Sequence, residues 1–294
     1  MNYDVNVSDT PSVFCEGGLN YKVLSFEAKT VEVAKNPNAS GAITIPSQVT
    51  YNGIAYAVVG IGDNAFDRNK NIKQVSLPST IKYVGYCAFQ ALRISMTLPS
   101  SLEKVARSAF TYNTFADLNL PSGLKEIGGS AFGYTTVQSG RAIIPASVVS
   151  IDGNGFYGSS IREISVSADN PSYKSISGVL FSKDAKKLIT YPHAKADAIY
   201  AIPTGVTTIG KESFENNRNL THLVIPATVN KLEDCALWSC PGMRRLEVKT
   251  PIPPVVGDKS LNGVKSDCVI IVPKGSARSY KTSEGWKQFN IVEI

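Results

Sequence analysis

The sequence predicts a mostly β solenoid: a stack of short coils with one continuous parallel β-sheet along one face, short 3-10 or irregular segments between strands, and β-rich caps at both ends. Three observations predict it. A unit recurs along the chain at intervals of 21 to 24 residues. Apolar residues hold a fixed register within each unit. The 294 residues are 43% hydrophobic and 18% charged, which is enough apolar material for a core and too little charge for disorder.

The unit is clearest in residues 75–89, 96–110 and 118–132, which superpose without a gap on the register L-x-L-P-x-x-L-x-x-I-x-x-x-A-F. Alternating apolar residues before the proline indicate a short strand with one buried face, and the proline ends that strand. Small residues near Gly128 suit a tight corner. Weaker copies occupy residues 142–156, 200–214 and 223–237, and the first copy, residues 43–66, carries an insertion near Asn52.

One interval is too long for a single coil. Pro145 and Pro203 are 58 residues apart, and residues 164–167 fall where the hidden strand is due, with Ser167 in the place of proline. Two apolar-rich runs around a polar turn at residues 178–191 predict a β-hairpin inserted into this coil.

A phenylalanine closes almost every unit, and Leu237 stands where one more is expected. Because these rings occupy one fixed place in an apolar register, we expect them to form a stack in the core and not a binding strip. The residues are Phe66, Phe89, Phe110, Phe132, Phe156 and Phe214.

This register resembles that of the BspA-like branch of the leucine-rich repeat proteins, and the resemblance covers nearly the whole chain. It implies a leucine-rich repeat solenoid with a β-hairpin cap at residues 1–42, an array of about eight coils at 43–247 with a hairpin insertion near 170–192, and a cap at 248–294. Proteins of this family are usually secreted or exposed on bacterial cells, and some are linked to adhesion. The family has no catalytic residues to carry over.

Signals of other chemistry are missing from the sequence. The two histidines, His193 and His222, have no ligand cluster near them, and neither a nucleophile elbow nor a phosphate loop occurs. We therefore expect no enzyme activity, no metal and no cofactor. The basic residues, which give a net charge of +6, are spread out, so we expect no nucleic-acid partner.

Five cysteines leave at least one free thiol. Cys87 and Cys235 hold the same place in coils on the order of 29 Å apart, at roughly 4.8 Å per coil, which is too far for a disulfide. Cys235 and Cys240 could form a local bridge or remain free. We expect most of the cysteines to be free.

The export prediction rests on the family resemblance. Residues 1–6 have neither a basic start nor an apolar run, and no stretch reaches the roughly 18 apolar residues of a membrane span. We expect a secreted or cell-surface protein whose signal was removed, without membrane insertion; a cytoplasmic protein is the alternative.

The leading functional hypothesis is a monomeric, non-catalytic module that binds a host protein or a glycan. A structural spacer within a larger surface protein is the alternative, and a carbohydrate-active enzyme on a repeat scaffold is the least favoured. Tyr112 and Tyr134 follow the stacked phenylalanines by two residues, and Tyr157 follows its phenylalanine by one, so all three should line one edge. Tyrosine is favoured at interfaces, which makes these residues the candidate binding site; alternatively, the rings cover the coil corners. The outward strand positions are small and mostly polar: Thr44, Ser76, Thr97, Asn119, Ile143 and Val224.

Overall fold

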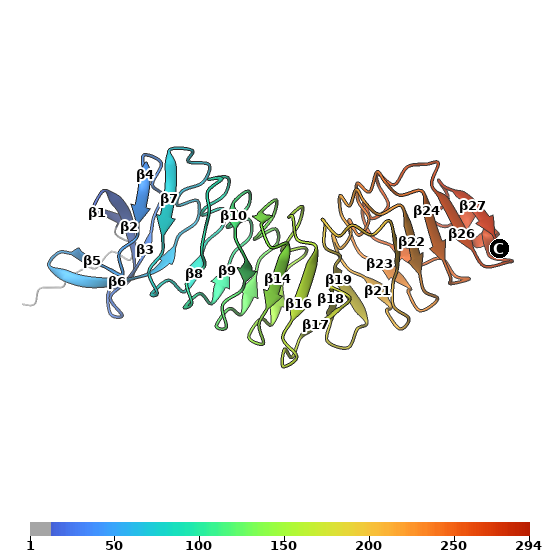
Figure 1. Ribbon diagram of the computed structural model, residues 1–294, viewed down its shortest axis with the longest axis horizontal. Coiled ribbons are helices and arrows are strands. Elements are labelled where there is room, and N and C mark those ends of the chain that lie inside the picture. The colour runs from blue at the N-terminus through green and yellow to red at the C-terminus, as the bar shows by residue number, and fades with distance from the viewer. Residues whose placement is uncertain (1–12) are drawn as a thin grey trace, which may run out of the picture.

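The computed structural model describes residues 13–294 as an elongated, gently curved stack of about 11 turns (Figure 1). Strands provide nearly all of its regular structure, and α1 (Ala277–Thr282) is the one α-helix in this range. The mostly β leucine-rich repeat solenoid that the sequence predicts is confirmed. No helix within residues 13–294 is long and apolar enough to cross a membrane. The chain start on which the signal prediction rests lies outside the described residues.

The N-terminal end of the stack is an antiparallel meander. β1 (Val13–Glu16) pairs with β2 (Leu19–Ser25), β2 pairs with β3 (Thr30–Val33), and β3 then pairs in parallel with β6 (Ile54–Ile61). The insertion in the first repeat is a hairpin between β5 (Gln48–Tyr51) and β6. Asn52 and Gly53 form its turn with φ values of 52° and 75°, as a two-residue type I′ connection requires.

Short parallel strands stack along the back of the solenoid, one per coil. The apolar residue of each enters the core and its neighbour faces solvent, which explains the Ile or Val at this place in the repeat. After β6 the strands are β8 (Tyr83–Val84), β9 (Lys104–Val105), β12 (Glu126–Ile127) and β15 (Ser150–Ile151). Beyond the insertion they are β19 (Lys187–Thr190), β21 (Thr208–Ile209), β23 (Lys231–Leu232) and β25 (Val255–Val256).

The L-x-L-P strands form the front face, but the expectation of one continuous sheet is wrong. Its first segment joins β4 (Gly41–Thr44) to β7 (Ile72–Ser76). The second comprises β11 (Leu118–Asn119), β14 (Arg141–Ile144) and β16 (Glu163–Val166). The third comprises β20 (Ile199–Ala201), β22 (His222–Ile225), β24 (Arg245–Val248), β26 (Val269–Val272) and β27 (Asn290–Glu293).

Each break has a local cause. The Met96 N–H donates to the carbonyl oxygen of Thr114 at 2.8 Å, so this segment of its coil joins the side of the solenoid where β10 (Thr114–Phe115) pairs with β13 (Thr136–Val137). The second break lies at the inserted hairpin, because the Ile164 N–H donates to the carbonyl oxygen of Gly178 at 2.9 Å instead of to a following front strand.

The predicted hairpin at residues 178–191 is confirmed, and it forms a wall across the interior. β17 (Tyr173–Ile176), β18 (Val179–Ser182) and β19 pair in antiparallel order. Side chains alternate across a strand, so Leu180 of β18 packs into one hydrophobic cluster while Val179 and Phe181 pack into another. The solenoid therefore contains two cores on either side of β18.

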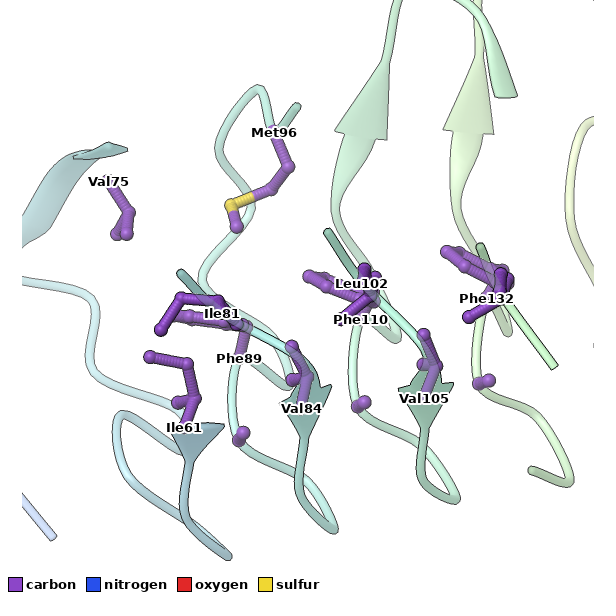
Figure 2. Packing of buried hydrophobic residues seen from close by; sticks show 14 of the residues in the cluster. Ile61, Val75, Ile81, Val84, Phe89, Met96, Leu102, Val105, Phe110 and Phe132 are labelled. Carbon is purple, nitrogen blue, oxygen red and sulfur yellow. The ribbon is translucent and has the colours of Figure 1, made fainter. Parts of the chain in front are cut away.

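The expected phenylalanine stack is confirmed for its first five members. Successive ring centroids from Phe66 to Phe132 are 5.6 Å apart, and Phe156 follows Phe132 at 5.9 Å. Figure 2 shows three of these rings beside the Ile, Val and Leu side chains of the same coils. Phe214 departs from the expectation, because its stacking partner is Tyr191 at 5.1 Å, from the end of the hairpin.

Outside each phenylalanine the chain makes a corner with two residues at positive φ, one before the ring and one after. Ser108 and Tyr112 flank Phe110 with φ values of 57° and 65°. Gly128 shows why small residues occur here, since a Cβ at this position would lie 2.4 Å from the backbone nitrogen of Arg107 in the preceding coil.

Aromatic residues close the C-terminal end. Tyr280 on α1 and Trp286 are fully buried, and their rings meet edge to face at 5.4 Å. The Trp286 Nε1–H donates to the Pro254 carbonyl oxygen at 2.9 Å, and the Tyr280 hydroxyl donates to that of Thr250 at 2.8 Å. These contacts hold the last turn on the segment between β24 and β25.

Candidate binding site

The structure brings the three predicted tyrosines together along one edge. The Tyr112 and Tyr134 rings are parallel within 5°, with centroids 4.8 Å apart. Tyr157 meets Tyr134 edge to face at 5.0 Å, and their hydroxyl oxygens are 3.1 Å apart. The coil register sets this spacing, because Tyr112 and Tyr134 occupy the same corner position in successive coils. We call these three residues the tyrosine row.

Exposure divides the row. Tyr112 and Tyr134 leave 41% and 37% of their surface in solvent, whereas Tyr157 is half-buried, and burial raises the pKa of its hydroxyl. The Arg93 guanidinium carbon lies 6.0 Å from the Tyr112 ring centroid, within cation–π range. Tyr157 thus partly fits the alternative of a corner cover, while the other two rings are open to a partner. Their binding role stays a prediction.

A cleft opens where the row ends. Corner turns succeed one another from Phe66 to Phe156, each donating backbone N–H groups to carbonyls of the next. The following coil has no such corner, because the β18–β19 hairpin brings Tyr191 to the place of the phenylalanine and the chain then leaves through Pro192. Asn154 spans the interruption by donating from Nδ2 to the Glu212 carbonyl oxygen at 3.1 Å and from its backbone to Glu212 Oε2 at 3.3 Å.

The missing corner leaves a cavity of about 230 Å³ between the two sides, which we call the junction cleft. Its polar lining includes two cations, Arg107 and Lys211, and three carboxylates, Asp152, Glu212 and Glu215. Two aromatic rings complete it, the half-buried Tyr157 and Trp238, which is 40% exposed. A second cavity of about 250 Å³ adjoins it and shares Asp152 and Lys211.

Glu215 is the most perturbed carboxyl in this lining. Burial, followed by the charge of neighbouring Glu212, raises its pKa from 4.5 to about 7, although a hydrogen bond with Tyr157 opposes the change. The Lys211 ammonium lies 3.6 Å from Glu212 Oε1. The cleft therefore contains a carboxyl that takes up a proton at a higher pH than an ordinary glutamate does.

We expect Glu215 to make the protein less stable as pH rises. Its folded pKa lies above the usual value, so the folded state holds the proton more tightly, and stability falls between pH 4.5 and about 7 before levelling. The full effect is at most roughly 3 kcal/mol. Urea unfolding of the native protein and of Glu215→Gln from pH 4 to 8 measures it: the difference between them should shrink toward low pH. Parallel curves would mean that Glu215 titrates normally.

Sequence reasoning missed the cleft residues. Asp152, Lys211, Glu215 and Trp238 come from three corners whose relative placement depends on the insertion. The 58-residue interval between Pro145 and Pro203 was the available signal, because a hairpin in place of a corner leaves a gap in the stack.

The cysteines, the possible metal ligands and the outward strand residues form no second candidate site within residues 13–294. All five cysteines are free, including Cys235 and Cys240, and burial raises the pKa of Cys240 to about 12, which makes it an unreactive thiol near neutral pH. No group of three or more His, Cys, Asp or Glu side chains within residues 13–294 could hold a metal ion. Of the outward strand positions, Thr44, Ser76, Thr97, Asn119 and Ile143 are exposed and Val224 is half-buried.

Fold and site together define a class of protein: a leucine-rich repeat scaffold with an exposed aromatic edge. The model of the BspA type leucine rich repeat region matches residues 59–187 and 195–266 in six copies, which is more than half of the chain. The protein belongs to this family, as the repeat register indicated. A search of curated proteins finds no match.

Solved bacterial structures share the fold. A leucine-rich repeat protein from Eubacterium ventriosum matches with a TM-score of 0.63 and 19% identity, over 95% of this chain and 83% of its own. The pneumococcal vaccine antigen PcpA matches at 0.57 and 19%, over 98% and 100%. A leucine rich cell surface protein from Faecalibacterium prausnitzii matches at 0.53 and 22%, over 97% and 95%.

Proposed function

We propose that this protein is a non-catalytic binding module, displayed outside the cell, that captures a protein or a glycan. The observation that carries the proposal is the pair of exposed, parallel rings of Tyr112 and Tyr134. The phenylalanine stack already fills the core beneath them, so folding alone gives little reason for two large rings to stand in solvent. Rigid aromatic side chains contribute contact area at low cost in conformational entropy.

The family supports export. Its solved relatives include a protein described as a leucine rich cell surface protein and another described as a vaccine antigen. A solenoid suits display because its surface residues vary without disturbing the stacked interior. Fractionation of the source cells tests the location, and recovery only from the cytoplasm would remove the display part of the proposal.

The double variant Tyr112→Ser/Tyr134→Ser tests the binding edge. We expect it to lose capture of its ligand while its melting temperature stays within a few degrees, because both rings lie outside the buried core. The assay uses immobilised matrix proteins and a glycan array. Tyr86→Ser is the matched control, since Tyr86 is 47% exposed on a corner outside the row; it should retain capture.

Two other outcomes would contradict the edge. Capture that survives the double variant would place the ligand elsewhere on the solenoid. A melting temperature lowered by many degrees would make the rings structural. If the native protein captures nothing in either format, the spacer alternative is favoured.

Glu215 favours the enzyme alternative, because a carboxyl whose pKa is raised to about 7 can serve as a general acid or base. Incubation with chromogenic glycosides separates the alternatives. We expect no release of the chromophore; release that Glu215→Gln abolishes would replace a binding module by a hydrolase.

A further inference from the structure

The junction cleft carries an inference that rests on the proposed function and deepens it. We propose that the cleft binds a single uncharged sugar ring, at the end of a glycan whose next residues lie along the tyrosine row.

The size of the cleft favours a small occupant. The cavity of about 230 Å³ is smaller than the roughly 300 Å³ at which pockets for drug-sized ligands begin. Two hydrogen bonds between Asn154 and Glu212 join the two sides of the interruption next to the cleft. A cavity of this volume accommodates one sugar ring, and the second cavity of about 250 Å³ lies beside it.

The balance of charge disfavours an ionic occupant. The two basic groups, Arg107 and Lys211, lie in the same lining as Asp152 and Glu212, and burial raises the pKa of the remaining carboxyl, Glu215, to about 7. An anion would face the carboxylates and a cation would face the two basic groups, so neither gains a net attraction. A neutral ligand with many hydroxyls avoids this conflict, because each hydroxyl both donates and accepts hydrogen bonds.

Aromatic rings provide the apolar contact that such a ligand needs. Trp238 belongs to the second corner beyond the interruption and Tyr157 to the corner before it, and both line the cavity. A pyranose has C–H faces that stack on such rings, while its hydroxyls at the rim reach the charged groups. A small apolar ligand would leave those polar groups without partners, at a cost in binding free energy.

The tyrosine row continues from the cleft in one direction. Tyr157 lines the cavity, and its hydroxyl lies 3.1 Å from that of Tyr134, which stacks on Tyr112. A glycan with its terminal ring in the cleft would therefore meet two further rings, one coil apart. This arrangement makes the cleft and the row parts of one extended site.

The native protein carries its own reporter for the test. Its two tryptophans are Trp286, which is fully buried, and Trp238, which is 40% exposed, so a ligand-induced change in tryptophan fluorescence reports on the cleft. The probes are the methyl glycosides of glucose, galactose, mannose and N-acetylglucosamine, with methyl glucuronide and methyl glucosaminide as anionic and cationic counterparts. Saturation-transfer NMR on the full chain provides a second readout.

We expect at least one neutral glycoside to bind weakly, to change Trp238 fluorescence and to outcompete both charged counterparts. Asp152→Asn and Trp238→Ser should each weaken binding about tenfold or more, with NMR as the readout where the tryptophan is removed. Asp117→Asn is the control, because this exposed carboxylate lies outside the cleft lining. Melting curves establish that each variant is folded. If Trp238→Ser does not fold, Asp152→Asn alone tests the cleft.

Different outcomes would overturn the sugar cleft and the binding role of the tyrosine row. The sugar cleft is overturned if no neutral glycoside binds, or if a charged one binds with equal affinity. In that case, ligand capture that depends on Tyr112 and Tyr134 still supports the binding module. If a neutral glycoside binds in the cleft but no glycan or matrix protein depends on those tyrosines, the cleft stands and the row is overturned.

Discussion

Replacing Phe110 by alanine is expected to destabilise the protein by about 3–5 kcal/mol. The ring is fully buried, lies 5.6 Å from both Phe89 and Phe132, and meets Phe115 edge to face at 5.8 Å. Its removal leaves a cavity inside a column of rings, and the fixed spacing of the coils prevents the column from closing. Urea unfolding of the purified variant measures the loss.

The neighbouring substitution Tyr112→Ala is the matched control. It removes an aromatic ring of similar size two residues later in the same corner, but one that lies outside the core and is 41% exposed, and we expect a loss below about 1 kcal/mol. Similar losses for the two variants would mean that the column does not stabilise the stack more than the surface row does.

Deleting residues 255–294 is expected to have the second large effect. The deletion removes Tyr280 and Trp286 together with β26, which pairs with β24. Leu246 and Val248, which are buried in the intact protein, would then face solvent at an open strand edge. We expect soluble aggregates by size-exclusion chromatography and binding of a hydrophobic dye.

A single substitution tests the packing of the C-terminal end without the gross misfolding that a deletion can cause. Trp286→Ala should also lower stability by about 3–5 kcal/mol, since it leaves a cavity and deprives the Pro254 carbonyl of its donor. A truncated protein that stays monomeric with an unchanged melting temperature would show that the array ends before residue 255 and that the last segment covers nothing.

The parts of the fold that could be predicted are those repeated in every coil. The positions of Phe89, Phe110 and Phe132 follow from the register alone, because a ring that recurs at one apolar position has to be stacked. The tyrosine row follows for the same reason, since a corner position repeats with its coil.

What could not be predicted depends on departures from the repeat. Met96 looks like a strand residue, yet its N–H donates to Thr114 and its coil contributes no strand to the front face. The junction cleft is a second case, because Glu215 and Trp238 line a cavity only where a corner is missing from the stack. A periodic pattern specifies what is present in each coil, whereas the consequences of an omission emerge only in three dimensions.

The wall that β18 forms has a mechanical consequence. Elsewhere neighbouring coils share a common interior and at least the ladder along the back, so a load along the axis is spread over many bonds. At β18 the two interiors are separate, the front strands are not paired across the insertion, and Asn154 takes the place of the corner ladder on its side. A stretched or sheared molecule would yield first at this seam, which is also where the cleft lies. A ligand that contacts both sides of the seam would oppose their separation. Tension on the protein would therefore weaken binding in the cleft, and a bound ligand would strengthen the seam.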